Sequence, residues 1–180
     1  FLPGTCGDIT QVDNLATTRR PGGEQSAQFV GGRVGAEAVK VLLGMTRGSF
    51  TPVGAKTKTL TIPRRVPRPE RVKACMEMVQ KDPKEVGATD WTFAKEIVML
   101  DAILAKHPTA EAEVQALQVG PAVFLSDPAE YFCEFGLDMK ARSKFPFTFP
   151  VELANGCVGY VPTEEALSST GGGYETRLTS

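Results

Sequence analysis

An apolar stripe with helical spacing lies between two strand-like segments, and this order constrains the fold more than any other feature. Between Trp91 and Lys106, apolar side chains recur three and four residues apart, which predicts a helix with one wide buried face. Lys56–Ile62 alternates polar with larger or β-branched residues, as a half-buried strand does, and Glu113–Val119 is also strand-like. Strands that alternate with helices predict an α/β or α+β fold with a mixed sheet and flanking helices.

A helical insertion is predicted at 66–107, between two core strands. Pro69 suits the first position of a helix, and one apolar face follows it along the chain, made of Val72, Cys75, Met76 and Val79. A polar break at 81–90 separates this helix from the next, for which Asp90 is the predicted N-cap. Because one domain is usual for a chain of this length, we expect 1–180 to form a single domain.

The last third predicts three strands and one helix. The apolar run Ala122–Leu125 indicates a strand that is buried on both faces. A helix is expected to open at Ser126-Asp127-Pro128, with Glu130 in its first turn and with one apolar face made of Phe132, Phe135 and Met139. Phe147–Leu153 and Val158–Val161 are predicted as two further strands.

The first third is predicted to hold less regular structure. Residues 1–30 are rich in glycine, threonine, proline and aspartate, and 9–30 are predicted to form a long irregular loop. From Arg33 to Leu43 apolar residues recur at helical spacing, and Gly44 is expected to end that helix. The chain begins without an initiator methionine or a signal peptide, and we expect it to be a fragment of a larger catalytic domain.

Charge and cysteine content exclude several classes of protein. Twenty basic and 21 acidic residues give a net charge of −1, which removes the positive field expected of a nucleic-acid binder. No apolar run approaches the roughly 18–20 residues that cross a bilayer. The four cysteines, Cys6, Cys75, Cys133 and Cys157, show no CxxC spacing, so a zinc ribbon is excluded while their disulfide state stays open. His107 is the only histidine, so this chain cannot supply a histidine metal cluster.

Two residues are candidates for chemistry on the basis of their positions. Glu130 follows a predicted buried strand, where a carboxylate can reach a metal or a substrate in the crevice of an α/β sheet. Tyr160 lies close to Gly156 and Gly159, where the backbone can approach a ligand and the phenol can meet a metal or an oxyanion. For both residues a structural role, as a helix-start charge and as a core or rim aromatic, remains open at this point.

Three stretches together resemble the neutral/alkaline (non-lysosomal) ceramidase family, in particular its shorter bacterial relatives. The opening Phe1-Leu2-Pro3-Gly4-Thr5-Cys6-Gly7-Asp8-Ile9 resembles the family's strand and Gly-Asp turn. Val114–Leu125 is similar to the strand, turn and strand that lead to its Pro-Gly-Glu motif, here Pro128-Ala129-Glu130. The most specific part is Leu153-Ala154-Asn155-Gly156-Cys157-Val158-Gly159-Tyr160-Val161-Pro162-Thr163-Glu164-Glu165-Ala166, followed by Gly173-Tyr174-Glu175.

This resemblance implies a zinc-dependent amide hydrolase that acts on N-acylsphingosine or a related lipid amide through metal-activated water. It implies Glu130 and Tyr160 as zinc ligands and Tyr174 as the catalytic residue that steadies the oxyanion. The family's two histidine ligands belong to a more N-terminal region, so the remainder of the catalytic domain is the implied partner. An exported or membrane-associated location is implied in the same way.

The sequence also departs from the family pattern. Gly4 occupies the place where ceramidases carry a serine that contributes to catalysis, and the interval from Glu130 to Tyr160 is shorter. Two alternatives therefore remain beside a ceramidase-like enzyme. One is a hydrolase of a different amide or ester, and the other is a non-catalytic relative with a binding or structural role.

Overall fold

The computed structural model describes residues 1–10, 12–13, 15–18 and 22–177, and it contains helices together with a mixed sheet. This confirms the predicted α/β or α+β class. The elements follow one another along the chain as α1 (Gly23–Gly44), β1 (Val53–Pro63), α2 (Pro69–Met78), α3 (Pro83–Val86), α4 (Ala88–Leu104), β2 (Thr109–Val119), β3 (Ala122–Ser126), β4 (Ala129–Tyr131), α5 (Cys133–Arg142), β5 (Phe147–Val151) and β6 (Gly159–Val161).

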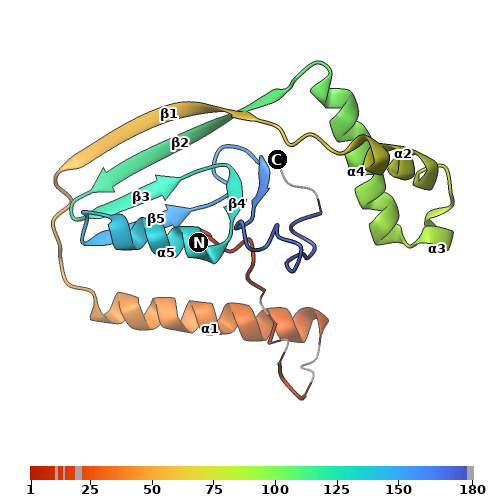
Figure 1. The fold of residues 1–180 in the computed structure, drawn as a ribbon. Coiled ribbons are helices and arrows are strands. Elements are labelled where there is room, and N and C mark those ends of the chain that lie inside the picture. The colour runs from red at the N-terminus through yellow and green to blue at the C-terminus, as the bar shows by residue number, and fades with distance from the viewer. Residues whose placement is uncertain (11, 14, 19–21, 178–180) are drawn as a thin grey trace.

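The larger sheet has the strand order β1-β2-β3-β5, and it arches over α5 (Figure 1). β1 and β2 pair antiparallel over their full length, from Val53 opposite Val119 to Pro63 opposite Thr109. β3 continues the sheet antiparallel to β2, and β5 closes it parallel to β3. The two short strands β4 and β6 form a separate parallel pair, which becomes the centre of the candidate site.

The predicted helical segment lies between β1 and β2. Because these strands pair up to their outer ends, α2, α3 and α4 stand beyond the end of the sheet (Figure 1). Their small core consists of Val72, Cys75, Ala94 and Ile97. The predicted N-cap at Asp90 is wrong, because α4 begins at Ala88 after Gly87, whose φ of 90° suits glycine.

The first helix is longer than the sequence pattern predicts. α1 begins at Gly23, so much of the expected loop at 9–30 is helical; residues 11, 14 and 19–21 of that loop lie outside the described part. The loop was predicted from the glycine, threonine, proline and aspartate content of residues 1–30, although a glycine costs a helix interior only about 1 kcal/mol. α1 buries none of its residues, and Val34 and Leu42 are 51% and 67% exposed.

No helix in the described part of the chain combines the length and the hydropathy needed to cross a bilayer. This agrees with the absence of a transmembrane segment expected from the sequence.

The helix expected to open at Ser126 does not form, and this moves Glu130. Asp127 Oδ1 accepts a hydrogen bond from the Ala129 backbone N–H at 2.9 Å, which holds a turn. The next three residues then form β4 by pairing with β6, and α5 begins only at Cys133. Local sequence could not indicate this outcome, since the partner strand is about 30 residues away.

The strand at Ala122–Leu125 is also less buried than predicted. Only Val123 is buried in β3, while Phe124 is partly exposed and stacks on Phe149 of β5 with ring centroids 5.2 Å apart. One face of the sheet is therefore open at this point.

Candidate active site

Glu130 and Tyr160 lie directly opposite each other in the parallel pair of β4 and β6. Their side chains are close enough to interact, because the charge of Glu130 is one of the causes that raise the pKa of Tyr160. Glu130 is therefore on a strand and not in the first turn of a helix, where the sequence pattern placed it. Two residues that are 30 positions apart in the sequence meet at one point of the structure.

The phenol of Tyr160 is held in its neutral form. Burial raises the pKa of Tyr160 to about 12, and the negative charge of Glu130 acts in the same direction. At neutral pH the group is consequently a hydrogen-bond donor and not a phenolate.

Tyr174 joins the same group of side chains. Its ring lies edge-on to Tyr160, with centroids 6.3 Å apart and an interplanar angle of 86°. On its other side, Phe93 of α4 makes a second edge-to-face contact at 5.1 Å. Tyr174 is 58% exposed, so its hydroxyl can meet a molecule that arrives from solvent. The structure thus brings together all three site residues that the sequence singled out.

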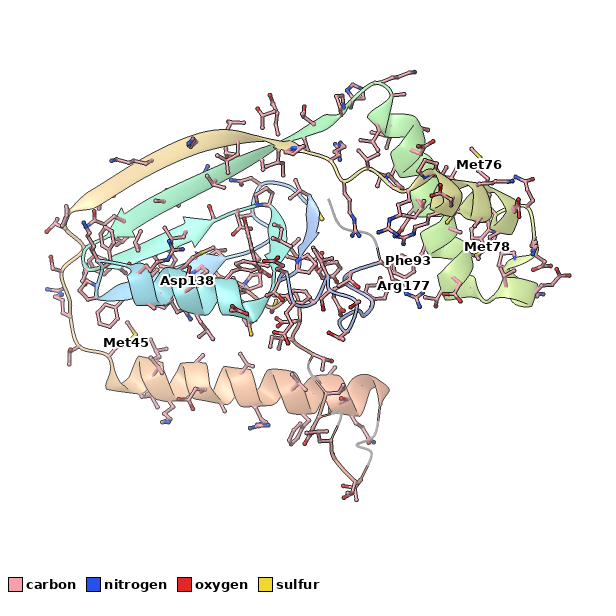
Figure 2. The ribbon with its side chains drawn as sticks, in the orientation of Figure 1. Met45, Met76, Met78, Phe93, Asp138 and Arg177 are labelled. Atoms are coloured by element: carbon pink, nitrogen blue, oxygen red, sulfur yellow. The ribbon has the colours of Figure 1, made fainter. Side chains whose placement is uncertain are left out.

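The segment that carries Tyr174 is attached to the helices of 66–107. Arg177 Nη1 lies 2.6 Å from Asp90 Oδ1, and the Arg177 guanidinium stands over the ring of Phe93 at 5.1 Å. Figure 2 shows Phe93 and Arg177 together where α4 meets the C-terminal segment. Arg71 of α2 adds a hydrogen bond of 2.6 Å to the Arg177 carbonyl. In the sequence, Asp90 and Phe93 lie one helical turn apart, but nothing there indicates that Arg177 contacts both of them.

Two buried carboxyls, Asp127 and Glu152, lie behind the strand that carries Glu130, and they are 6% and 2% exposed. Burial is the main cause that raises the pKa of Asp127 to about 6 and raises that of Glu152 above its usual range. The charge of Asp127 contributes further to the raised pKa of Glu152. Glu152 Oε1 has no hydrogen-bond partner among the described residues. The sequence indicates only that both residues lie near the end of a predicted strand. It does not indicate that their carboxyls are buried.

Cys6 is a poor candidate for a nucleophile in this environment. Its backbone N–H and its thiol both donate to Glu152 Oε2, at 3.1 and 3.6 Å. Partial burial raises the pKa of the Cys6 thiol, and the charge of Glu152 raises it further, so the reactive thiolate is disfavoured. All four cysteines are free thiols.

The residues present can supply part of a zinc shell. Glu130 and Tyr160 offer two oxygen donors from directly opposite positions of paired strands, and two ligands of a tetrahedral zinc at bonds of about 2.1 Å are separated by about 3.4 Å. No group of three or more His, Cys, Asp or Glu side chains suited to a metal occurs among the described residues. The donor set therefore fits half of the inner shell, which needs further ligands to be complete.

Gly4, which the sequence analysis compared with a serine of ceramidases, has room for a side chain. A Cβ added there would meet only the Pro150 carbonyl oxygen, at 3.9 Å, which is an ordinary contact. Glycine at this position is therefore not required by packing.

Comparison with known proteins adds no relative. No protein-family model, no curated protein and no solved structure matches this chain.

Proposed function

We propose that this chain contributes Glu130, Tyr160 and Tyr174 to the active site of a zinc-dependent hydrolase of lipid amides. The resemblance to neutral ceramidases suggests N-acylsphingosine or a related amide as the substrate. The observation that carries the proposal is the pairing of Glu130 with Tyr160 across β4 and β6, with Tyr174 beside them.

Each side chain has a role that follows from its surroundings. The Glu130 carboxylate is an acceptor and a ready metal ligand, because carboxylate oxygen is a common zinc donor. The Tyr160 oxygen would bind the metal beside Glu130, and the charge of a bound cation would favour release of the phenol proton to solvent. The exposed Tyr174 hydroxyl can donate to the oxyanion that develops on the amide carbonyl. Zinc, when bound, lowers the pKa of its water to about 7 and polarises the carbonyl.

A zinc titration tests this assignment in the chain as it exists. Since Glu130 and Tyr160 are only two ligands, we expect weak binding that tightens when imidazole is added to take the place of the two histidines. Calorimetry measures the affinity, and the ultraviolet band of phenolate reports whether Tyr160 loses its proton on binding. Glu130→Gln and Tyr160→Phe should each abolish the imidazole-dependent binding.

Two control variants test whether zinc binds at another place in the chain. Glu134→Gln removes a carboxylate from the exposed first turn of α5, and Tyr131→Phe removes a phenol from β4. Both should bind zinc as the unchanged chain does. Zinc binding that is indifferent to Glu130→Gln and Tyr160→Phe would contradict the metal site. In that case Gly4 and the lack of a third described ligand would favour the non-catalytic alternative, a scaffold with a binding role.

A further inference from the structure

We propose that the arginine-lined cavity at residues 65–71 binds a phosphate group. The cavity measures about 590 Å³, within the range of about 300–1,000 Å³ typical of small-molecule sites. Its lining residues lie between the end of β1 and the first turns of α2, two elements that Figure 1 labels, and Arg71 bonds to the C-terminal segment. This proposal does not depend on the zinc site.

The lining carries an excess of positive charge. Its residues are Arg65, Val66, Pro67, Arg68, Glu70 and Arg71. The lining thus contains three arginines and one glutamate, in a chain whose overall net charge is −1. Positive charge is thus concentrated in one cavity and not spread over a face, which suits one compact oxyanion better than a nucleic-acid backbone.

The backbone around the cavity is fixed before any ligand arrives. Pro67 is buried, and Pro69 is the first residue of α2, so ring constraints hold φ at both positions. The Arg64 backbone N–H donates to the Pro108 carbonyl at 2.9 Å, which anchors the chain just before the cavity. A rigid frame lowers the entropy lost when the arginine side chains close on a ligand.

The arginines already turn toward oxygen acceptors. Arg71 Nη2 donates to the Arg177 carbonyl at 2.6 Å, and Arg65 Nη1 donates to the Thr176 carbonyl at 3.5 Å. A guanidinium has five N–H donors, so the bond to Arg177 leaves most of the Arg71 donors for another acceptor. The side chain of Arg68 makes no hydrogen bond or ion pair with any residue in the described ranges. Phosphate offers charged oxygens that match the guanidinium fork in a bidentate manner.

Titration with inorganic phosphate tests the proposal. At low ionic strength, calorimetry should show saturable binding to the unchanged chain, and chloride at the same concentration should not compete. Arg68→Gln should weaken the affinity about fivefold or more, because charge-assisted hydrogen bonds are lost. Lys73→Gln removes the same charge from an exposed position of α2 outside the lining, and it should change the affinity less than about twofold.

A second variant keeps the test decisive if Arg68→Gln fails to fold. Arg68→Lys retains the positive charge but lacks the planar guanidinium fork. We expect this variant to fold, which circular dichroism measures, and to bind phosphate more weakly than the unchanged chain does. Equal loss of affinity in Arg68→Gln and Lys73→Gln would overturn the proposal, since binding would then follow net charge alone.

The phosphate could belong to a small ester or to a lipid headgroup, and vesicles separate these sources. Sedimentation with phosphatidylcholine vesicles, with and without phosphatidylglycerol, is compared with the calorimetry. Binding of inorganic phosphate points to a small phosphate ester. Binding only to phosphatidylglycerol vesicles, lost in Arg68→Gln and kept in Lys73→Gln, points to a headgroup. Binding to neither probe overturns the site.

Discussion

The Arg177 guanidinium lies 2.6 Å from the Asp90 carboxylate, although 87 positions separate the two residues in the sequence. This ion pair attaches the segment that carries Tyr174 to the first turn of α4. The helices of 66–107 therefore help to position Tyr174, even though none of the three predicted site residues lies on them.

Breaking this ion pair should release the C-terminal segment without unfolding the protein. Both side chains are about half exposed, so Asp90→Asn should lower the free energy of unfolding by at most about 1 kcal/mol. Hydrogen exchange of the Arg177 amide, which donates to the Tyr174 carbonyl, should nevertheless become faster. Asp138→Asn breaks a comparable exposed pair with Arg142 on α5 and should leave that exchange unchanged.

Removing the charge of Glu130 should lower the pKa of Tyr160. The value of about 12 arises first from burial and then from Glu130, so in Glu130→Gln we expect a pKa between 10 and about 12. A pH titration of the individual tyrosine resonances by NMR measures it. Glu134→Gln, on the exposed face of α5, serves as the control and should leave the Tyr160 titration where it is. An unchanged Tyr160 pKa in Glu130→Gln would show that the two side chains do not interact.

Asp127 should make the protein less stable as the pH rises from about 4 to 6. Its pKa rises from 3.8, the ordinary value of an aspartate, to about 6 in the folded protein, chiefly because the side chain is buried. The folded state therefore binds more protons than the unfolded state in this interval, and stability falls with rising pH. Asp127→Asn keeps the oxygen that accepts from Ala129 but cannot ionise. It should match the unchanged chain near pH 4 and exceed it above pH 6 by up to about 3 kcal/mol. Urea denaturation at both pH values measures the difference, and equal stabilities above pH 6 would contradict the assignment.

Two glycines in helices should respond oppositely to alanine. A Cβ at Gly136 of α5 would overlap the side chain of Thr5, so Gly136→Ala should lower the free energy of unfolding by about 1–3 kcal/mol despite the better helix propensity. Nothing lies within 4 Å of a Cβ at Gly35 of α1, so Gly35→Ala should stabilise that helix by about 1 kcal/mol. Urea denaturation measures the first effect, and hydrogen exchange of α1 amides measures the second. A loss of protection in Gly35→Ala would mean that α1 packs more closely than described.

The sequence predicted most of the elements because their signals are local. Lys56–Ile62 alternates as a strand should and lies within β1, and Trp91–Lys106 carries the stripe that α4 buries at Ala94 and Ile97. Pro69 starts α2 as its ring constraint predicts. The prediction failed at Ser126-Asp127-Pro128, where a good helix-start pattern is followed by a strand.

For the candidate site, too, the sequence indicated one part and the tertiary structure decided the rest. Residue type and sequence position singled out Glu130 and Tyr160, and the family resemblance added Tyr174. Tertiary structure alone decided that β4 would pair with β6, that Tyr174 would rest between Phe93 and Tyr160, and that Asp127 and Glu152 would be buried behind them. The physical reason is the distance along the chain over which each kind of interaction acts. Helix propensity and strand alternation act over a few residues, whereas strand pairing, ring contacts and burial depend on which distant segments the completed fold brings together.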